Sequence, residues 1–276
     1  MSSEQSFDAA LDLLRRLDPN RLEEHLQNLI QLEPSLAEDL LSSVDTPLQV
    51  KKDPKSSHRE YLCCDYNRDI DSHRSPWSNV YFPELSAEDL KESPFPSESL
   101  RELEVLANDS FDIYRDLYYE GGISSVYLWE LDEENPQDYA GVVLFKKGDQ
   151  SLSNWDSIHV AEATHSGQDV TYRLTSTIIL YLDKAKQMTL SGNLTRQTEK
   201  KATIPAEGNA EHRHVAEVTN LGTLVEDVEI QMRTMLESVY FEKTRDIFHE
   251  TKNSVVSVEG QNKEAHQEII KGIQGM

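Results

Sequence analysis

Five consecutive segments within residues 123–199 alternate apolar and polar side chains, and this pattern constrains the fold more than any other feature of the chain. A two-residue period is typical of β-strands. Turn signals at Asn135–Pro136, Gly148–Asp149 and Ser166–Gly167 keep the links short, and sequential strands with short links form an antiparallel meander. The exposed edges of such a sheet must be managed, and pairing with a partner's sheet is one solution. The predicted strands are Ile123–Asp132, Tyr139–Lys147, Trp155–Thr164, Val170–Asp183 and Thr189–Glu199.

Helical patterns precede this block. Within residues 1–46, apolar residues recur three or four positions apart in three short stretches. Asp18–Pro19 breaks the first stretch, and Pro34 lies at a first-turn position of the third. Short connections favour antiparallel neighbours, so we expect a three-helix stalk. A further helix begins near Ser97 and stops at Gly121–Gly122.

A long helix is predicted after the sheet, from about His212 to Asn253, with no breaker beyond Gly222. At 1.5 Å per residue it is a rod of about 60 Å, which is longer than the sheet is wide. Part of this helix must therefore rest on something else, and we expect a second subunit.

The last segment, residues 254–276, is a marginal amphipathic helix on a tether. At 100° per residue its apolar side chains share one sector, whereas its charged and amide side chains lie opposite. Gly260 separates it from the body, and Gly272 and Gly275 weaken it by up to about 1 kcal/mol each. Such a segment is better suited to docking than to a core.

These elements predict an α+β fold in one intertwined domain. It comprises a helical stalk (1–46), an irregular connector with a short strand at Tyr61–Cys64 (47–96), a helix and antiparallel sheet (97–205), a long helix packed on the sheet (206–253) and a mobile amphipathic tail (254–276).

The composition is strongly acidic, with a formal net charge of -23. Phosphate recognition requires clustered Lys and Arg, so this charge argues against nucleic acid or an anionic membrane surface as a partner. A few clustered cations can still act locally, within a Debye length of about 8–10 Å.

The chain is predicted to be cytoplasmic, because Met1–Ser6 lacks a signal-peptide pattern and Ile178–Leu182 is too short an apolar run to span a bilayer. The only cysteines, Cys63 and Cys64, are adjacent, which fits buried thiols in a reducing compartment better than a disulfide or a zinc site. We expect no metal and no cofactor.

Two other classes of function are alternatives to a subunit that binds partner proteins. An enzyme is disfavoured, because no nucleophile elbow, P-loop or dinucleotide fingerprint is present, and His212 and His214 face different directions on a helix. A generic coiled-coil or adaptor scaffold would also suit the long helix and its charged faces.

Several ordered blocks, taken together, resemble the beta subunit of F-actin-capping protein. The resemblance covers nearly the whole chain and leaves out the tail and some loops. The blocks are Ala10–Leu17, Glu38–Asp45, Cys64–Asp69, Arg74–Asn79, Tyr114–Tyr118, Gly122–Trp129, Trp155–Val160, Leu194–Gln197 and Leu224–Asp227.

The resemblance implies a non-enzymatic, cytoskeletal protein of cortical actin structures. Its expected partner is an alpha subunit of the same fold, which continues the antiparallel sheet in an obligate heterodimer. The heterodimer binds the barbed end of actin filaments independently of calcium and blocks subunit addition and loss. Regulatory proteins with capping-protein-interaction motifs are further expected partners, and phosphoinositide regulation is an open question at this point.

The resemblance places actin binding on the long helix and the tail. Arg233 matches the family's actin-facing basic position, although a merely solvated arginine is the alternative. The tail diverges from the family, so Ala265, Ile269, Ile270 and Ile273 are assigned by their amphipathic pattern. Burying three isoleucines is worth about 5–9 kcal/mol, whereas ordering a dozen residues costs about 12–24 kcal/mol. The tail alone should bind weakly.

The resemblance also places a regulator-binding surface on the stalk side, at Arg16, Asp45, Asp65 and Tyr81. The two acids would pair with a basic peptide, and the tyrosine would supply a rigid contact area. Pairing of these side chains within the protein itself is the alternative.

Overall fold

The computed structural model describes residues 3–14, 17, 21–37, 40, 47–119, 121–131, 135, 137–147, 153–184, 188–204 and 210–236. The chain divides into two compact units, Met1–Val228 and Glu229–Met276.

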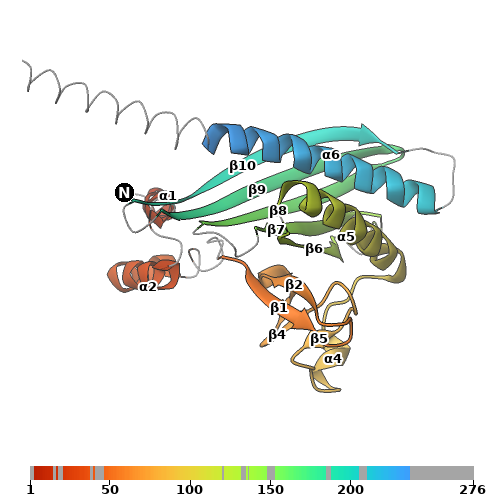
Figure 1. Cartoon of the computed structure of the whole chain (residues 1–276), viewed down its shortest axis with the longest axis horizontal. Coiled ribbons are helices and arrows are strands. Elements are labelled where there is room, and N and C mark those ends of the chain that lie inside the picture. Colours follow the sequence, from red (N-terminus) through yellow and green to blue (C-terminus); the bar gives the residue numbers. More distant parts are fainter. Residues whose placement is uncertain are drawn as a thin grey trace, which may run out of the picture. The chain divides into compact units, whose positions relative to one another are not determined.

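The predicted meander is confirmed as a five-stranded antiparallel sheet with the order β10-β9-β8-β7-β6 (Figure 1). Gly167 forms the β8–β9 turn with φ +66°, a conformation that glycine adopts without strain. The last three strands are longer than predicted because their polar ends, which carry no clear alternation, still pair in register. The strands are β6 (Ile123–Glu130), β7 (Tyr139–Lys146), β8 (Ser153–Ser166), β9 (Asp169–Lys184) and β10 (Met188–Thr203).

One face of the sheet lies under helix α5 (Glu98–Tyr118), seen in front of β6–β8 in Figure 1. The predicted start is confirmed, since the Ser97 side chain caps the helix by accepting from the backbone N–H of Leu100. Phe111 and Tyr119 pack on Phe145 of β7, with ring centroids 5.9 Å and 4.8 Å away. These aromatic contacts fix α5 over the middle of the sheet.

The same face also carries helix α6 (Ala210–Leu236), drawn in blue in Figure 1. Lys200 of β10 pairs with Asp227 at 3.6 Å, and the Tyr118 hydroxyl of α5 donates to Glu226 at 3.4 Å. A helix starting near residue 210 and packed on the sheet is therefore confirmed. The predicted continuation to Asn253 lies outside the described residues.

The opposite face packs on the hairpin of β1 (Gln49–Asp53) and β2 (Arg59–Cys63). Leu48 and Leu62 join Tyr127, Val142, Leu144, Ile158 and Ile179 in one buried cluster. The Tyr127 hydroxyl donates to the Leu62 carbonyl at 2.7 Å, so a buried polar group is satisfied where the two layers meet.

Residues 47–96 contain more regular structure than the single short strand that the sequence predicts. Besides β1 and β2 there is a three-stranded sheet of β3 (Arg68–Asp69), β4 (Ser72–Arg74) and β5 (Tyr81–Phe82), and a short helix α4 (Asp89–Glu92). Strands of two or three residues are too short to show a period. The buried carboxylate of Asp53 also orders this region, because it accepts from the hydroxyl of Ser75 at 2.5 Å and the backbone N–H of Ser78 at 3.2 Å.

The N-terminal region contains α1 (Ser3–Leu14) and α2 (Leu22–Leu32), which confirm two of the predicted helices. At the position of the third, a single 3₁₀ turn, η2 (Pro34–Leu36), is described. Leu14, Leu22, Leu36 and Leu40 form a separate small core.

A buried ion pair joins the 47–96 region to α5. Arg74 of β4 makes a bidentate contact with Glu104, at 2.8 Å and 2.7 Å, and the Glu104 side chain is fully buried. Glu104 also accepts from the backbone N–H of Leu128 on β6 at 2.7 Å and pairs with Arg101. One carboxylate thus connects three elements of the fold.

We predict that Glu104→Ala lowers the free energy of unfolding by about 3–5 kcal/mol, because it leaves the buried Arg74 guanidinium without its anion. The measurement is urea unfolding of the purified protein. Glu102→Ala is the matched control, since Glu102 is exposed on the same helix, and it should change the stability by less than about 0.5 kcal/mol. Equal losses for the two variants would contradict the prediction.

Candidate interaction surfaces

Strand β10 is the exposed edge of the main sheet. It is 16 residues long and pairs along its whole length with β9, whereas no described strand pairs with its other side. Every second residue of such an edge presents its N–H and C=O outward, which makes the edge a template for another strand. The neighbouring sheet surface away from the helices is polar, with Arg173 and Glu199 paired at 3.3 Å. The edge therefore fits pairing with a partner strand.

A second surface surrounds Asp65, at the start of the short 3₁₀ turn η3 (Asp65–Asn67). The Asp65 and Asp71 side chains are 82% and 95% exposed, and both lie 3.9 Å from Arg68. Between them Tyr66 stacks on Trp129 of β6, with ring centroids 5.3 Å apart. The buried Asn67 holds the turn, because its side chain accepts from the Cys64 N–H and donates to the Arg74 carbonyl. Tyr66 and Trp129 thus form an aromatic patch close in sequence to the exposed acids Asp65 and Asp71, on a turn held by the hydrogen bonds of Asn67.

Tyr81, assigned to the same surface by the sequence, is buried in the structure. Its side chain is 2% exposed, its hydroxyl donates to the Pro94 carbonyl at 2.7 Å, and its ring meets Phe95 edge-on. Burial raises the pKa of Tyr81 to about 12. In this chain Tyr81 is thus a packing residue beneath the 47–96 surface.

Of the other predicted contact residues, only Arg233 is described. It lies in the last turn of α6, where its Nε donates to Glu229 at 2.9 Å, and its side chain is 35% exposed. A glutamate four residues before an arginine is the favourable order on a helix. Arg16, Asp45, Ala265, Ile269, Ile270 and Ile273 lie outside the described residues.

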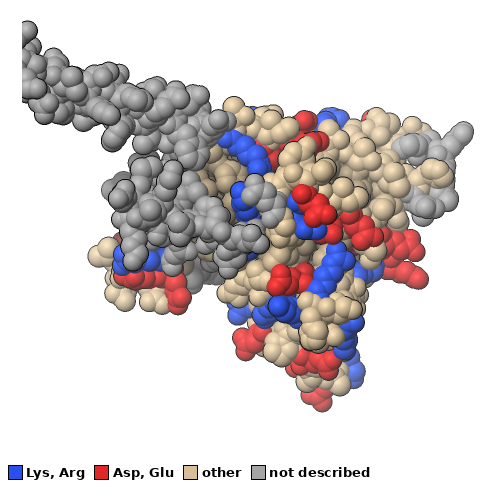
Figure 2. Space-filling view, viewed as in Figure 1, with Lys and Arg blue, Asp and Glu red and all other residues tan. Residues whose placement is uncertain are grey.

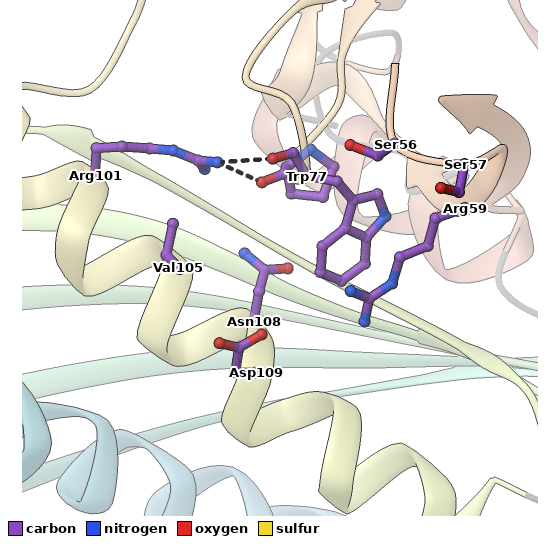
Figure 3. Close-up of a pocket in the computed structure, with 9 residues that line it drawn as sticks. Ser56, Ser57, Arg59, Trp77, Arg101, Val105, Asn108 and Asp109 are labelled. Carbon is purple, nitrogen blue, oxygen red and sulfur yellow. Dashed lines mark hydrogen bonds between the residues drawn. The ribbon is translucent and has the colours of Figure 1, made fainter. Parts of the chain in front are cut away.

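A hollow of about 650 Å³ opens between the β1–β2 turn and α5 (Figure 3). Trp77 lies in its centre, with the Arg59 guanidinium over the indole ring, 3.4 Å from the centroid. Arg59 also pairs with Asp112 at 3.1 Å, and Arg101 donates to the carbonyls of Pro76 and Trp77. Both guanidinium groups are thus committed to internal partners, and the hollow lacks a nucleophile with a base beside it.

The two thiols have no features of a reactive site. Burial raises the pKa of Cys63 and of Cys64 to about 12, so both are protonated at neutral pH. Among the described residues, no cluster of His, Cys, Asp and Glu is arranged to hold a metal ion, and no helix is long and apolar enough to cross a membrane.

Charges on the face shown in Figure 2 are mixed. Lysine and arginine side chains lie next to aspartate and glutamate on this face. Pairs such as Lys55–Glu84 and Arg115–Asp112 also occur in the structure.

The sequence could not identify the Tyr66–Trp129 stack or the Trp77 hollow. Each combines residues that are distant in the chain, and each residue by itself looks like any aromatic side chain in a turn or strand. Only the repeated acids around Tyr66, at positions 65, 69 and 71, were a visible signal.

Comparison with known proteins gives a full-length match. A family model described as the beta subunit of F-actin capping protein matches residues 7–248. Proteins named F-actin-capping protein subunit beta from Candida glabrata and Saccharomyces cerevisiae are 64% and 62% identical, and each alignment covers 99% of this chain and 100% of the relative. The protein of the same name from Yarrowia lipolytica is 52% identical with the same coverage.

Among solved structures, the homodimeric actin capping protein alpha subunit from Plasmodium berghei has a similar fold. The TM-score is 0.51 at 16% identity, and the match covers 91% of this chain and 96% of that chain. The likeness shows that the two chains share a fold.

Proposed function

This chain belongs to the F-actin capping protein beta-subunit family, and from that premise we propose that it is one subunit of a heterodimer that caps the barbed ends of actin filaments. In this role it blocks the addition and loss of actin subunits, independently of calcium and without catalysis. The observation that carries the proposal is the identity of 64% and 62% to two proteins of that name along their entire length.

The proposed partner is an alpha subunit that pairs with β10. The edge of this strand offers a row of backbone donors and acceptors beside a sheet of matching antiparallel geometry. An alpha subunit with the same fold, as in the Plasmodium structure, would present a comparable strand. The combined sheet would then run through both subunits.

The proposed actin contacts are Arg233 and the tail. Arg233 pairs with Glu229 through Nε, and its side chain is 35% exposed although its Nη2 is buried. Its charge would attract an acidic surface at the remaining accessible part. Ala265, Ile269, Ile270 and Ile273 would bind a hydrophobic groove. Because ordering the tail costs more than its burial yields, tight capping requires the body and both subunits' tails together.

The proposed regulator-binding surface comprises Arg16, Asp45, Asp65 and Tyr81; because Tyr81 is buried, its proposed role is to pack the region rather than to offer its hydroxyl. Asp65 is suited to a basic peptide because its carboxylate projects into solvent next to the exposed Tyr66 ring. Localisation to the cytoplasm, at cortical actin structures, follows from the proposed activity, and phosphoinositides are a further candidate regulator.

The decisive experiment is co-expression of the chain with its alpha subunit, followed by pyrene-actin elongation from filament seeds. We expect a stable two-chain complex that stops barbed-end growth at nanomolar concentration, equally in calcium and in a calcium chelator. Unchanged growth in the presence of a well-formed complex would favour the scaffold alternative. Failure to form any complex would contradict the heterodimer.

We predict that Ile269→Asp combined with Ile273→Asp accelerates dissociation from barbed ends about ten- to a hundredfold, because two apolar anchors are lost while the body still docks. Dissociation is measured by dilution of capped seeds. Gln267→Asp with Gln274→Asp is the matched control, since it adds the same charge on the opposite side of the tail helix. An unchanged dissociation rate for the isoleucine variant would exclude the tail as an anchor.

We predict that Asp65→Lys weakens binding of a basic capping-protein-interaction peptide about tenfold and leaves capping unchanged, because an exposed rim charge affects recognition more than folding. Peptide affinity is measured by fluorescence anisotropy. Glu92→Lys, which makes the same charge change on α4, should not alter peptide affinity.

Tyr81→Phe distinguishes a packing role of Tyr81 from direct contact between its hydroxyl and the regulator. It removes only the hydroxyl bonded to Pro94, so it should lower stability by about 1 kcal/mol and leave peptide affinity intact. A large loss of peptide binding in this variant would show that the tyrosine hydroxyl contacts the regulator.

A further inference from the structure

A buried histidine lies between two carboxylates where α6 meets the sheet. The His165 side chain, at the end of β8, is 3% exposed. Its Nδ1 lies 3.2 Å from Asp138, in the link before β7, and its Nε2 lies 3.5 Å from Glu217 of α6. The Glu217 side chain is itself 8% exposed. Three elements that are far apart in sequence therefore converge on one imidazole.

The surrounding groups are polar but uncharged. Tyr139 of β7 and Tyr172 of β9 are buried around Glu217. The buried atoms His165 Nε2, Tyr172 Oη and Asn220 Nδ2 make no hydrogen bond in the structure, so the 3.5 Å contact with Glu217 is an ion pair without hydrogen-bond geometry. Tyr139 donates a hydrogen bond to Glu217, so His165 is the cationic partner of a carboxylate that also has a neutral donor.

Other charged side chains near this site have their own partners or face away. Arg213, one turn earlier on α6, donates to Gln137. Lys200, opposite Tyr172 on β10, pairs with Asp227. Glu162 and Arg173 flank the site on β8 and β9 but alternate to the other face of the sheet.

We propose that His165 makes the attachment of α6 to the sheet sensitive to pH. Protonated His165 stabilises the packing of the N-terminal half of α6 on the sheet, and neutral His165 stabilises it less. Only the imidazolium carries a donor on both ring nitrogens, whereas a neutral imidazole has one donor and one acceptor. The neutral ring can therefore direct an N–H towards Asp138 or towards Glu217, but not towards both. Asp138 also accepts from the backbone N–H of His165 at 2.6 Å, whatever the charge of the ring. Loss of the proton therefore mainly removes the positive charge beside the buried Glu217, which is costly in a low-dielectric environment.

The electrostatics agree with this geometry. Burial by itself lowers the pKa of His165, but Glu217 and Asp138 together outweigh it and hold the pKa above its ordinary value. Because the pKa of His165 is higher in the folded than in the unfolded state, the stabilisation by protonated His165 is fully present below the unfolded-state pKa of about 6.5. It is lost as the pH rises through the folded-state pKa. The change therefore falls on the alkaline side of 6.5.

The test uses the full chain in complex with its alpha subunit and therefore rests on the proposed heterodimer. It needs no actin, so its outcome does not depend on barbed-end capping. We expect His165, observed by NMR of labelled histidines, to titrate above 6.5. Amide exchange in residues 210–228, corrected for intrinsic rates, should show a three- to tenfold loss of protection between pH 6.5 and 8.5. His165→Gln should abolish this pH dependence, and His58→Gln, at an exposed turn histidine, should retain it.

Glu217→Gln provides a second variant that keeps the size of the side chain. It should lower the His165 pKa and flatten the exchange profile even if His165→Gln folds poorly. Titration of His165 at or below 6.5 in the unmodified chain, or the same pH-dependent exchange in both the unmodified chain and Glu217→Gln, would overturn the proposal.

Discussion

The fold depends on a carboxylate that has no access to water. Glu104 balances Arg74 from β4 and Arg101 from its own helix, and it accepts the backbone N–H of Leu128 on β6. A bidentate guanidinium–carboxylate pair permits one relative orientation of its two elements. The 47–96 region and α5 are consequently both held against β6. The surface around Asp65 belongs to the 47–96 region and is positioned by the same contacts.

This constraint leaves the two faces of the sheet with different roles. One face is covered by the β1–β2 hairpin through Leu48 and Leu62, and the other by α5 and α6. With both faces occupied over β6 and β7, the free hydrogen-bonding capacity of the sheet lies at β10, the long outer strand. Assembly through that edge requires no rearrangement of the core, which is why edge pairing is the physically simplest way for this chain to join a partner of the same fold.

The sequence predicted the sheet well because β6–β10 are long enough for an alternating period to be visible. It missed β3–β5, whose two or three residues are too short to show a period, and β1, whose sequence Gln49–Asp53 is mostly polar and charged. Glu104 was one of 50 acids in the chain, and its role depends on Arg74, 30 positions away, which no local pattern reveals. Tyr81 shows the same limit at the candidate site. The resemblance assigned Tyr81 to a regulator-binding surface, yet the Pro94 carbonyl accepts from its hydroxyl and the Phe95 ring packs against it. The resemblance identified residue types at matching positions, but burial depends on the contacts that form around them.

Helix α6 carries both residues that contact the sheet and Arg233, the residue proposed to contact actin. Glu217 in its first half and Asp227 further along pair with side chains of the sheet, and its last described turn carries Arg233. In sequence it leads towards the tail, whose own burial cannot offset the entropy of ordering it. A weak anchor of that kind gains affinity only when its tether starts from a fixed point, because effective concentration falls as the attachment becomes mobile. Under the proposed function, the hold of the sheet on the first part of α6 would influence how tightly the tail binds, and the pairing of His165 with Glu217 is the pH-sensitive part of that attachment.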